Sequence, residues 1–171
     1  DFQQIGRKVI REIGYLDAAW GYDCNSVAIL TAVGKQSPDI ANGVNTALEV
    51  RGETKSAEEI GAGDQGMMIG YAVRETPVLM PLPISLAHRL TRRLAALRKN
   101  GEISWLRPDG KSQVTVEYNP DHTPKRVHTV LVSTQHAPEV TNGRIREEVI
   151  EKVVKPTVPA HLLDKDTKYF V

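Results

Sequence analysis

The chain has 171 residues, of which 40% are hydrophobic and 25% charged, and its 22 Lys and Arg against 21 Asp and Glu give a formal net charge of +1. This composition excludes intrinsic disorder as the main state, and the neutral balance disfavours a dedicated nucleic-acid binder. Since no apolar run approaches the ~20 residues of a membrane span and the single cysteine, Cys24, cannot form an internal disulfide, we expect a reduced, cytoplasmic protein that binds neither nucleic acid nor membranes.

The first segment, residues 2–13, predicts a helix that ends at Gly14, which suits a left-handed cap. Its apolar residues recur at helical spacing and form one stripe: Phe2, Ile5, Val9, Ile10 and Ile13. The following run Ser26–Val33 predicts a strand buried on both faces, although periodicity alone leaves a helical turn open. Because the chain begins at Asp1 within a helical pattern and ends in an apolar run at 169–171, we expect a piece of a longer protein.

Residues 34–63 show no sustained hydrophobic period. A stretch of this kind predicts a mobile active-site lid over 36–63, with a disordered linker as the alternative. Its start, Gln36–Ile40, is predicted to form a turn around Pro38. The glycines of Gly61–Gly66 fit G-x-G-x-x-G, but no buried strand precedes them and no acid lies between Pro77 and Gly101, so a Rossmann site is rejected. They remain either an ordinary tight turn or a point where the backbone approaches a ligand.

The second half predicts a small α+β arrangement. Residues 84–99 form the clearest helix, with Pro83 in its first turn and a basic face that we interpret as solvated. A hairpin is predicted from 113–118 and 127–134, then a helix over 144–154 that Pro156 stops, and a final strand at the chain's end. These elements favour a two-layer α+β architecture with a mixed sheet and helices on one face.

One polar cluster precedes the predicted hairpin, in residues 105–113. Asp109 could accept from a ribose or ammonium group, and Lys111 could donate to a phosphate. The alternative is a simple Pro-Asp-Gly turn, which is compatible with either role. None of the five histidines lies at metal-ligand spacing with another His or Cys, so a zinc site is disfavoured. Among them, His136 is the candidate for a functional role because it lies at a predicted strand end, although a structural role is favoured for it.

Four stretches together resemble the S-adenosylmethionine synthetase (methionine adenosyltransferase) family. Residues 61–71, GAGDQGMMIGY, are similar to a signature of that family, and 34–40, GKQSPDI, resemble the start of its active-site loop. Residues 107–113, RPDGKSQ, and 133–136, STQH, follow in the family's order. The second half of the loop, 49–59, is longer and more charged than in many relatives.

The resemblance implies an enzyme that forms S-adenosylmethionine from ATP and L-methionine with the help of Mg²⁺ and K⁺. It implies methionine contacts for Gln36, Ile40 and Asp64. It implies ATP contacts for Asp109, at the ribose, and for Lys111, at the phosphate chain, where Lys111 would also act catalytically. The family's metal ligands are expected mostly outside this chain, with none within it. A second subunit, in a homodimer or homotetramer, is an expected partner.

The resemblance also implies interleaved, pseudo-repeated domains. On that basis residues 1–35 belong to one interleaved domain, 36–63 to the lid and 64–171 to most of a second α+β domain. Since family segments on both sides are missing, we expect the isolated chain to be inactive. The alternative is a non-catalytic dimerisation or regulatory module with the same fold.

Overall fold

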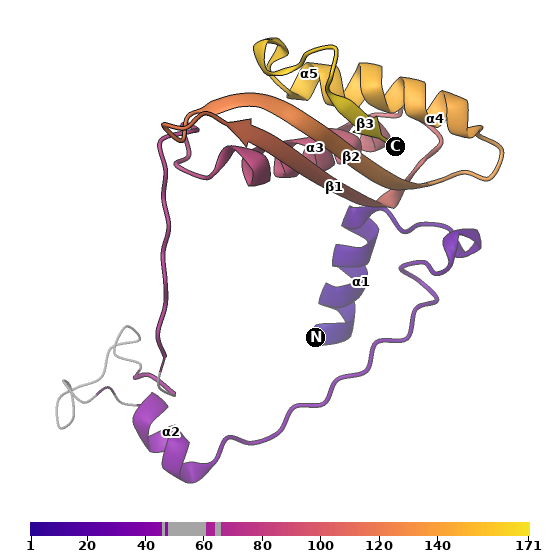
Figure 1. Ribbon diagram of the computed structural model, residues 1–171. Helices are drawn as coiled ribbons and strands as arrows, with labels where there is room; N and C mark the ends of the chain where they lie inside the picture. The colour runs from indigo at the N-terminus through magenta and orange to yellow at the C-terminus, as the bar shows by residue number, and fades with distance from the viewer. Residues whose placement is uncertain (46, 48–60, 64–65) are drawn as a thin grey trace. The chain divides into compact units, whose positions relative to one another are not determined.

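The computed structural model describes residues 1–171 except 46, 48–60 and 64–65 (Figure 1). The described chain divides into two compact units, one formed by Asp1–Ile29 with Tyr71–Val171 and the other by Leu30–Gly70. We call them the main unit and the loop unit. No helix in the described part of the chain is both long enough and apolar enough to cross a membrane.

Helix α1, Phe2–Ile13, opens the main unit and confirms the predicted helix. The Asp1 carboxylate accepts from the Gln3 amide, and Gly14 adopts a left-handed φ of 116° at the end of the helix. The polar side of the helix attaches it to the unit, because the Arg7 guanidinium donates to the carbonyls of Cys24 and Asn25 at 2.9 and 2.7 Å. Most of its apolar stripe is exposed, with Phe2 at 67%, and only Ile10 is half-buried.

The predicted buried strand at Ser26–Val33 is wrong. Residues 27–33 have no regular structure, and the Leu30 and Val33 side chains are 94% and 81% exposed. A strand needs a hydrogen-bonding neighbour, and no described strand pairs with this segment. Before it, the 3₁₀ turn η1, Ala18–Trp20, follows α1.

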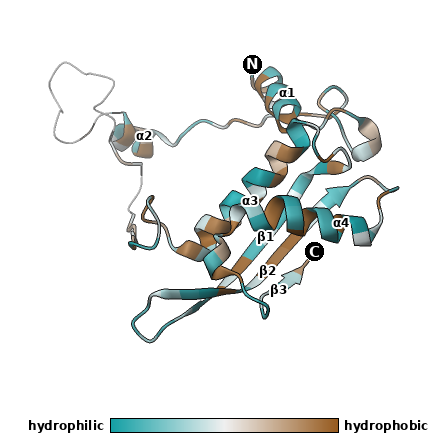
Figure 2. Cartoon of the chain, turned by 90° about the horizontal axis from the view of Figure 1, so that it is seen from above, coloured by the Kyte–Doolittle hydropathy of each residue, from teal (hydrophilic) through white to brown (hydrophobic). Residues whose placement is uncertain are grey.

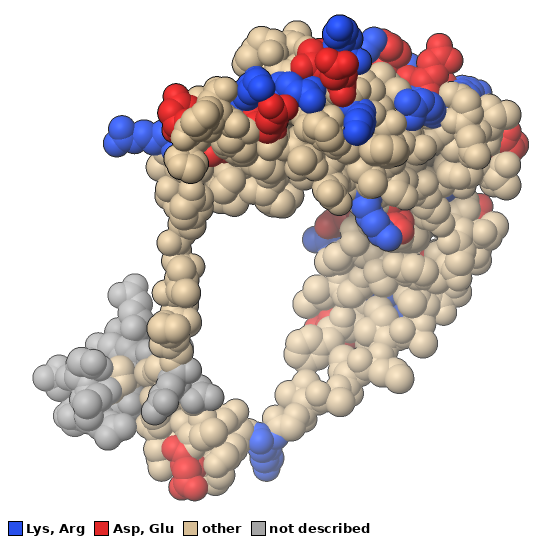
Figure 3. All heavy atoms as spheres, viewed as in Figure 1, with Lys and Arg blue, Asp and Glu red and all other residues tan. Residues whose placement is uncertain are grey.

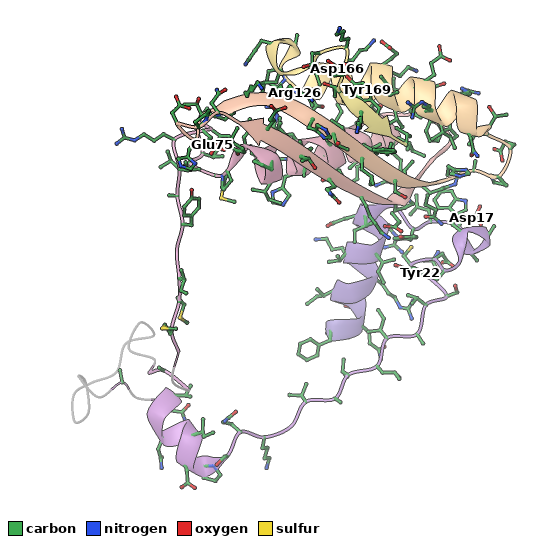
Figure 4. All side chains as sticks on the ribbon, in the orientation of Figure 1. Asp17, Tyr22, Glu75, Arg126, Asp166 and Tyr169 are labelled. Atoms are coloured by element: carbon green, nitrogen blue, oxygen red, sulfur yellow. The ribbon has the colours of Figure 1, made fainter. Side chains whose placement is uncertain are left out.

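Helix α3, Leu82–Lys99, confirms the predicted helix and begins two residues earlier than expected. The Glu75 carboxylate accepts from the Leu82 amide at 2.7 Å and from the Tyr118 hydroxyl at 2.8 Å, which ties the start of α3 to the end of a strand (Figure 4). Burial, followed by this carboxylate, raises the pKa of Tyr118 to about 12. Leu86, Leu90 and Leu97 of α3 are fully buried.

The sheet is mixed, as predicted. Strands β1, Leu106–Tyr118, and β2, Pro124–His136, are antiparallel, and β3, Lys168–Phe170, runs parallel to β2. One hydrophobic core lies between the sheet and the helices, α3 and those of the C-terminal part. The strands contribute to it Val114, its partner Val130 and the nearby Val132. Figure 2 shows these helices in front of the strands, so within the described part of the main unit the helices lie on one face of the sheet.

The C-terminal helix corrects one prediction. It runs as α4, Asn142–Glu148, then as the π-helical segment η3, Val149–Val154, and as α5, Lys155–Thr157, before the 3₁₀ turn η4, Ala160–Leu162. Pro156 therefore lies inside the helix and does not stop it. A proline clashes with the carbonyl four residues earlier, and the wider π turn makes room for it.

The loop unit contains one described helix, α2, Pro38–Val44. The predicted turn at Gln36–Ile40 is thus the beginning of a helix, with Ser37 as its N-cap and Pro38 in its first turn, where proline is tolerated. The Gly61 amide donates to the Val44 carbonyl at 2.9 Å, which closes the described part of this unit. The predicted domain boundaries at 35/36 and 63/64 stay a prediction.

Candidate functional site

Asp109 and Lys111 lie on β1 and flank Gly110. A Cβ added at Gly110 would lie 3.4 Å from Cδ1 of Leu94 on α3, so position 110 faces the helix layer. Ser112 faces it too, since its hydroxyl donates to the Ala87 carbonyl of α3 at 2.7 Å. Because side chains alternate along the regular part of the strand, Lys111 points away from the helix layer. Asp109 and Lys111 are both exposed, whereas Gly110 between them is half-buried. The structure thus brings these two candidate residues together on one surface.

The stretch before Gly110 is a bulge. Leu106 pairs with His136, and the next regular pair is Gly110 with Thr134. Three residues of β1, 107–109, therefore lie opposite the single residue Gln135 of β2. The predicted Pro-Asp-Gly turn is therefore wrong. Strand pairing with β2 wins over the local turn preference, and the bulge absorbs Pro108, which has no N–H to give to a ladder.

The bulge is fastened to its neighbours by side chains. The Thr134 hydroxyl donates to the Asp109 carbonyl at 3.3 Å, and Nη1 of Arg107 donates to the carbonyls of Ser104 and Leu106 at 3.2 and 3.4 Å. The Arg107 guanidinium carbon also lies 4.3 Å from the centroid of a Trp20 ring. These contacts set the backbone from which the Asp109 carboxylate projects.

Trp20 and Tyr15 were not predicted from the sequence, and both belong to the segment between α1 and residue 24. Tyr15 stacks on Tyr22, with centroids 4.5 Å apart, and Tyr22 and Asp17 are labelled in this segment in Figure 4. The pKa of Tyr15 is raised by burial, then by the neighbouring Tyr22 and Asp109. A tryptophan followed by a glycine in a short polar segment is the only sequence signal that could have pointed to Trp20.

A cavity of about 330 Å³ adjoins the bulge. Arg107, Trp20 and Leu106 line it together with residues of α1 and α3, among them Arg11 and Arg98. Neither Asp109 nor Lys111 is among the lining residues. The two candidate residues are exposed and do not contribute to the wall of this cavity.

The predicted methionine-binding residues belong to the loop unit. Gln36 is exposed just before α2, and Ile40, on α2, is 44% exposed. Asp64 lies outside the described residues. A meeting of these residues with Asp109 and Lys111 stays a prediction.

The histidine singled out from the sequence ends β2. Nδ1 of His136 lies 2.8 Å from the Ala137 carbonyl oxygen, a contact that fits a structural role. Within the described residues, no three His, Cys, Asp or Glu side chains are grouped so that they could hold a metal ion.

Charges of both signs cover the described main unit. Figure 3 shows acidic and basic side chains side by side over the C-terminal helices and the hairpin. Within α4 and η3, the Glu148 carboxylate accepts from Arg144 at 2.7 Å and from Lys152 at 3.4 Å. On α3, Arg89 and Arg92 are exposed, whereas Arg98 donates to the Ile13 carbonyl at 2.7 Å. This mixture is typical of a solvated surface.

Comparison with known proteins identifies relatives across the chain. The family model described as S-adenosylmethionine synthetase, central domain, matches residues 59–171. The S-adenosylmethionine synthase of Streptococcus equi subsp. zooepidemicus (strain H70) is 56% identical over 172 residues, which are 100% of this chain and 43% of that protein. The proteins of the same name from Streptococcus suis (strain 05ZYH33) and Roseiflexus castenholzii (strain DSM 13941 / HLO8) are 56% and 57% identical over 100% and 99% of this chain. The chain spans less than half the length of these relatives, 44% and 42% for the last two.

Proposed function

The chain belongs to the S-adenosylmethionine synthetase family, an enzyme family, and from this premise we propose that it is a central piece of an enzyme that forms S-adenosylmethionine from ATP and L-methionine. The methionine sulfur donates an electron pair to the ribose 5′ carbon, and the bond from that carbon to the phosphate oxygen breaks. Triphosphate leaves with the bonding electrons and is then hydrolysed to phosphate and diphosphate.

The observation that carries this proposal is the placement of Asp109 and Lys111. An acceptor and a cation lie two residues apart on one strand and are both exposed, and the residue between them faces the helix layer. In the proposal, the Asp109 carboxylate accepts hydrogen bonds from the ATP ribose. Lys111 donates to the phosphate chain, where its ammonium group stabilises the charge that grows on the leaving triphosphate.

The methionine end of the site is assigned to the loop unit. Gln36 and Ile40 contact methionine in this proposal, and Asp64 holds its amino-acid end. Ile40 is exposed on α2 and so is available to an apolar side chain. Closing such a loop over two substrates excludes water and aligns sulfur, carbon and leaving oxygen.

Mg²⁺ and K⁺ are part of the proposal, but the described residues do not fit a metal site by themselves. The described residues contain no cluster of three or more ligating side chains, and in this proposal the metal ligands lie mostly outside this chain. A second subunit of a homodimer or homotetramer, and a cytoplasmic location, complete the proposal.

The experiment is a product assay on two proteins. The full-length protein that contains this chain, incubated with ATP, L-methionine, Mg²⁺ and K⁺, is expected to form S-adenosylmethionine, measured by mass spectrometry. The isolated 171 residues are expected to form none. A full-length protein that forms no product but still dimerises would support the alternative, a non-catalytic module. Product from the isolated chain would overturn its assignment as an incomplete piece.

A further inference from the structure

Trp20 is held by both strands at the point where the sheet ladder is interrupted. On the β1 side, the guanidinium of Arg107 stacks on its ring with 4.3 Å from the guanidinium carbon to the centroid. On the β2 side, Nε2 of Gln135 donates to the Trp20 carbonyl at 3.3 Å. Gln135 is the one residue of β2 opposite the three bulged residues. Trp20 therefore bridges the two strands across the bulge.

The bulge needs such support. Pro108 cannot donate to the ladder, and the regular register resumes only at Gly110. Arg107 fixes the start of the bulge through the carbonyls of Ser104 and Leu106. An arginine side chain is long and flexible, so a contact that holds its head group favours these two bonds. The Trp20 ring supplies a flat face for that head group.

The segment around Trp20 is built to present the ring. The Asp17 carboxylate accepts from the Ala19 amide at 2.9 Å, and the Trp20 amide donates to the Asp17 carbonyl at 3.0 Å. Gly21 then takes a φ of 113°, which lets the chain turn away directly after the tryptophan. The 3₁₀ turn η1 thus has its own local hydrogen bonds, and the ring and the carbonyl of Trp20 are free to bind the two strands.

We propose that Trp20 is a positioning residue for nucleotide binding: through Arg107 and Gln135 it fixes the bulge of β1, and with it the direction in which Asp109 meets the nucleotide's ribose. This inference rests on the proposed function of Asp109. Trp20 touches no reacting atom. Its loss lets the bulge sample other backbone conformations and lowers the fraction of protein in which Asp109 is correctly placed.

The expected signature is selective. Replacing the ring by leucine in Trp20→Leu raises the KM for ATP about tenfold, a loss comparable to that of a partly desolvated cation–π contact. The KM for L-methionine stays within about twofold, because the loop unit carries the methionine contacts. Trp20→Phe keeps an aromatic face and restores the ATP KM to within about threefold of the parent value.

The test compares these variants in the full-length protein with Asp109→Ala and with Arg92→Leu, an exposed arginine of α3 that serves as control. If Asp109→Ala raises the ATP KM and Trp20→Leu does not, the positioning role is wrong while the proposed site stands. If Asp109→Ala leaves the ATP KM unchanged, the proposed site is wrong and the positioning role with it. Equal increases in both KM values for Trp20→Leu also contradict the inference, because they indicate general misfolding.

A second variant keeps the test decisive if Trp20→Leu fails to fold. Arg107→Lys retains the charge but loses the planar group that stacks on the ring. We expect the KM of the Arg107→Lys variant for ATP to rise about five- to tenfold and its KM for L-methionine to stay unchanged. An unchanged ATP KM in a folded Arg107→Lys protein would overturn it.

Discussion

Arg93 of α3 donates through Nε to the carbonyl oxygen of Lys152 at 3.1 Å. In a regular α-helix that carbonyl would accept from the amide of residue 156, four positions later. Residue 156 is proline, which has no amide hydrogen. The arginine of a neighbouring helix thus takes the place of the missing donor, and this contact, 59 positions apart in sequence, joins α3 to the C-terminal helix.

Removing this donor is expected to destabilise the fold. Arg93→Leu leaves the Lys152 carbonyl without its partner, and we expect a loss of about 1–2 kcal/mol in the free energy of unfolding. Urea denaturation followed by circular dichroism measures it. The control is Arg92→Leu, at an exposed position beside it, which is expected to change stability by less than about 0.5 kcal/mol. Equal losses in both variants would show that the Arg93 contact carries no specific stability.

Lys111 is expected to matter for turnover and not for folding. Lys111→Met keeps the length of the side chain and removes its charge, and we expect kcat of the full-length protein to fall about 100-fold or more. The thermal midpoint stays within about 2 °C, because the side chain is exposed. Lys168→Met is the matched control, since Lys168 is an exposed lysine of β3. A fall in kcat that merely follows a loss of folded protein would favour a structural role.

The free energy of unfolding is expected to depend on pH through Glu148. Hydrogen bonds from Arg144, and then from Lys152, lower its pKa against the opposing effect of burial. A carboxylate with a lowered folded-state pKa stabilises the fold above its unfolded pKa, near 4.3, and this stability is lost as pH falls through the folded pKa. Unfolding free energies from pH 6 to pH 3 are therefore expected to fall less steeply for Glu148→Gln than for the parent chain. Parallel curves for the two proteins would contradict this assignment.

Gly14 is expected to control the local stability of α1. Its φ of 116° strains any other residue, and the Arg98 guanidinium occupies the place of a new Cβ. Because no residue of α1 is buried, we expect Gly14→Ala to open this helix locally and to leave the core unchanged. Hydrogen exchange of α1 amides is expected to accelerate about tenfold while α3 amides keep their rates. Gly143→Ala on α4, where a Cβ meets nothing within 4 Å, is the control and should change neither.

Elements with local signals were predictable from the sequence. The helix at Phe2–Ile13 has a periodic stripe and a glycine cap, and α3 has its proline and its leucine repeat, so short-range rules suffice. The hairpin follows from alternation, and the exposed position of Lys111 follows from the same period once the strand is known.

Apart from the turn expected at Gln36–Ile40, which is the beginning of α2, the errors involve partners that are distant in sequence. Ser26–Val33 is apolar enough for a strand, but only a neighbouring strand makes it one. The Pro-Asp-Gly sequence favours a turn until residues 134–136 pair beside it. Pro156 stays in its helix with the help of Arg93 on α3. Trp20 was not predicted because its contacts are with Arg107 and Gln135, which are far along the chain.

The bulge of β1 also bears on solubility. In the described sheet, β1 is an outer strand of 13 residues, and a long, flat outer strand invites pairing with other molecules. Pro108 removes a donor and the bulge bends the strand, so the rim that presents Asp109 is also a poor template for aggregation. Substitutions that straighten residues 107–109 would therefore make the protein prone to intermolecular β-pairing as well as misplace a carboxylate.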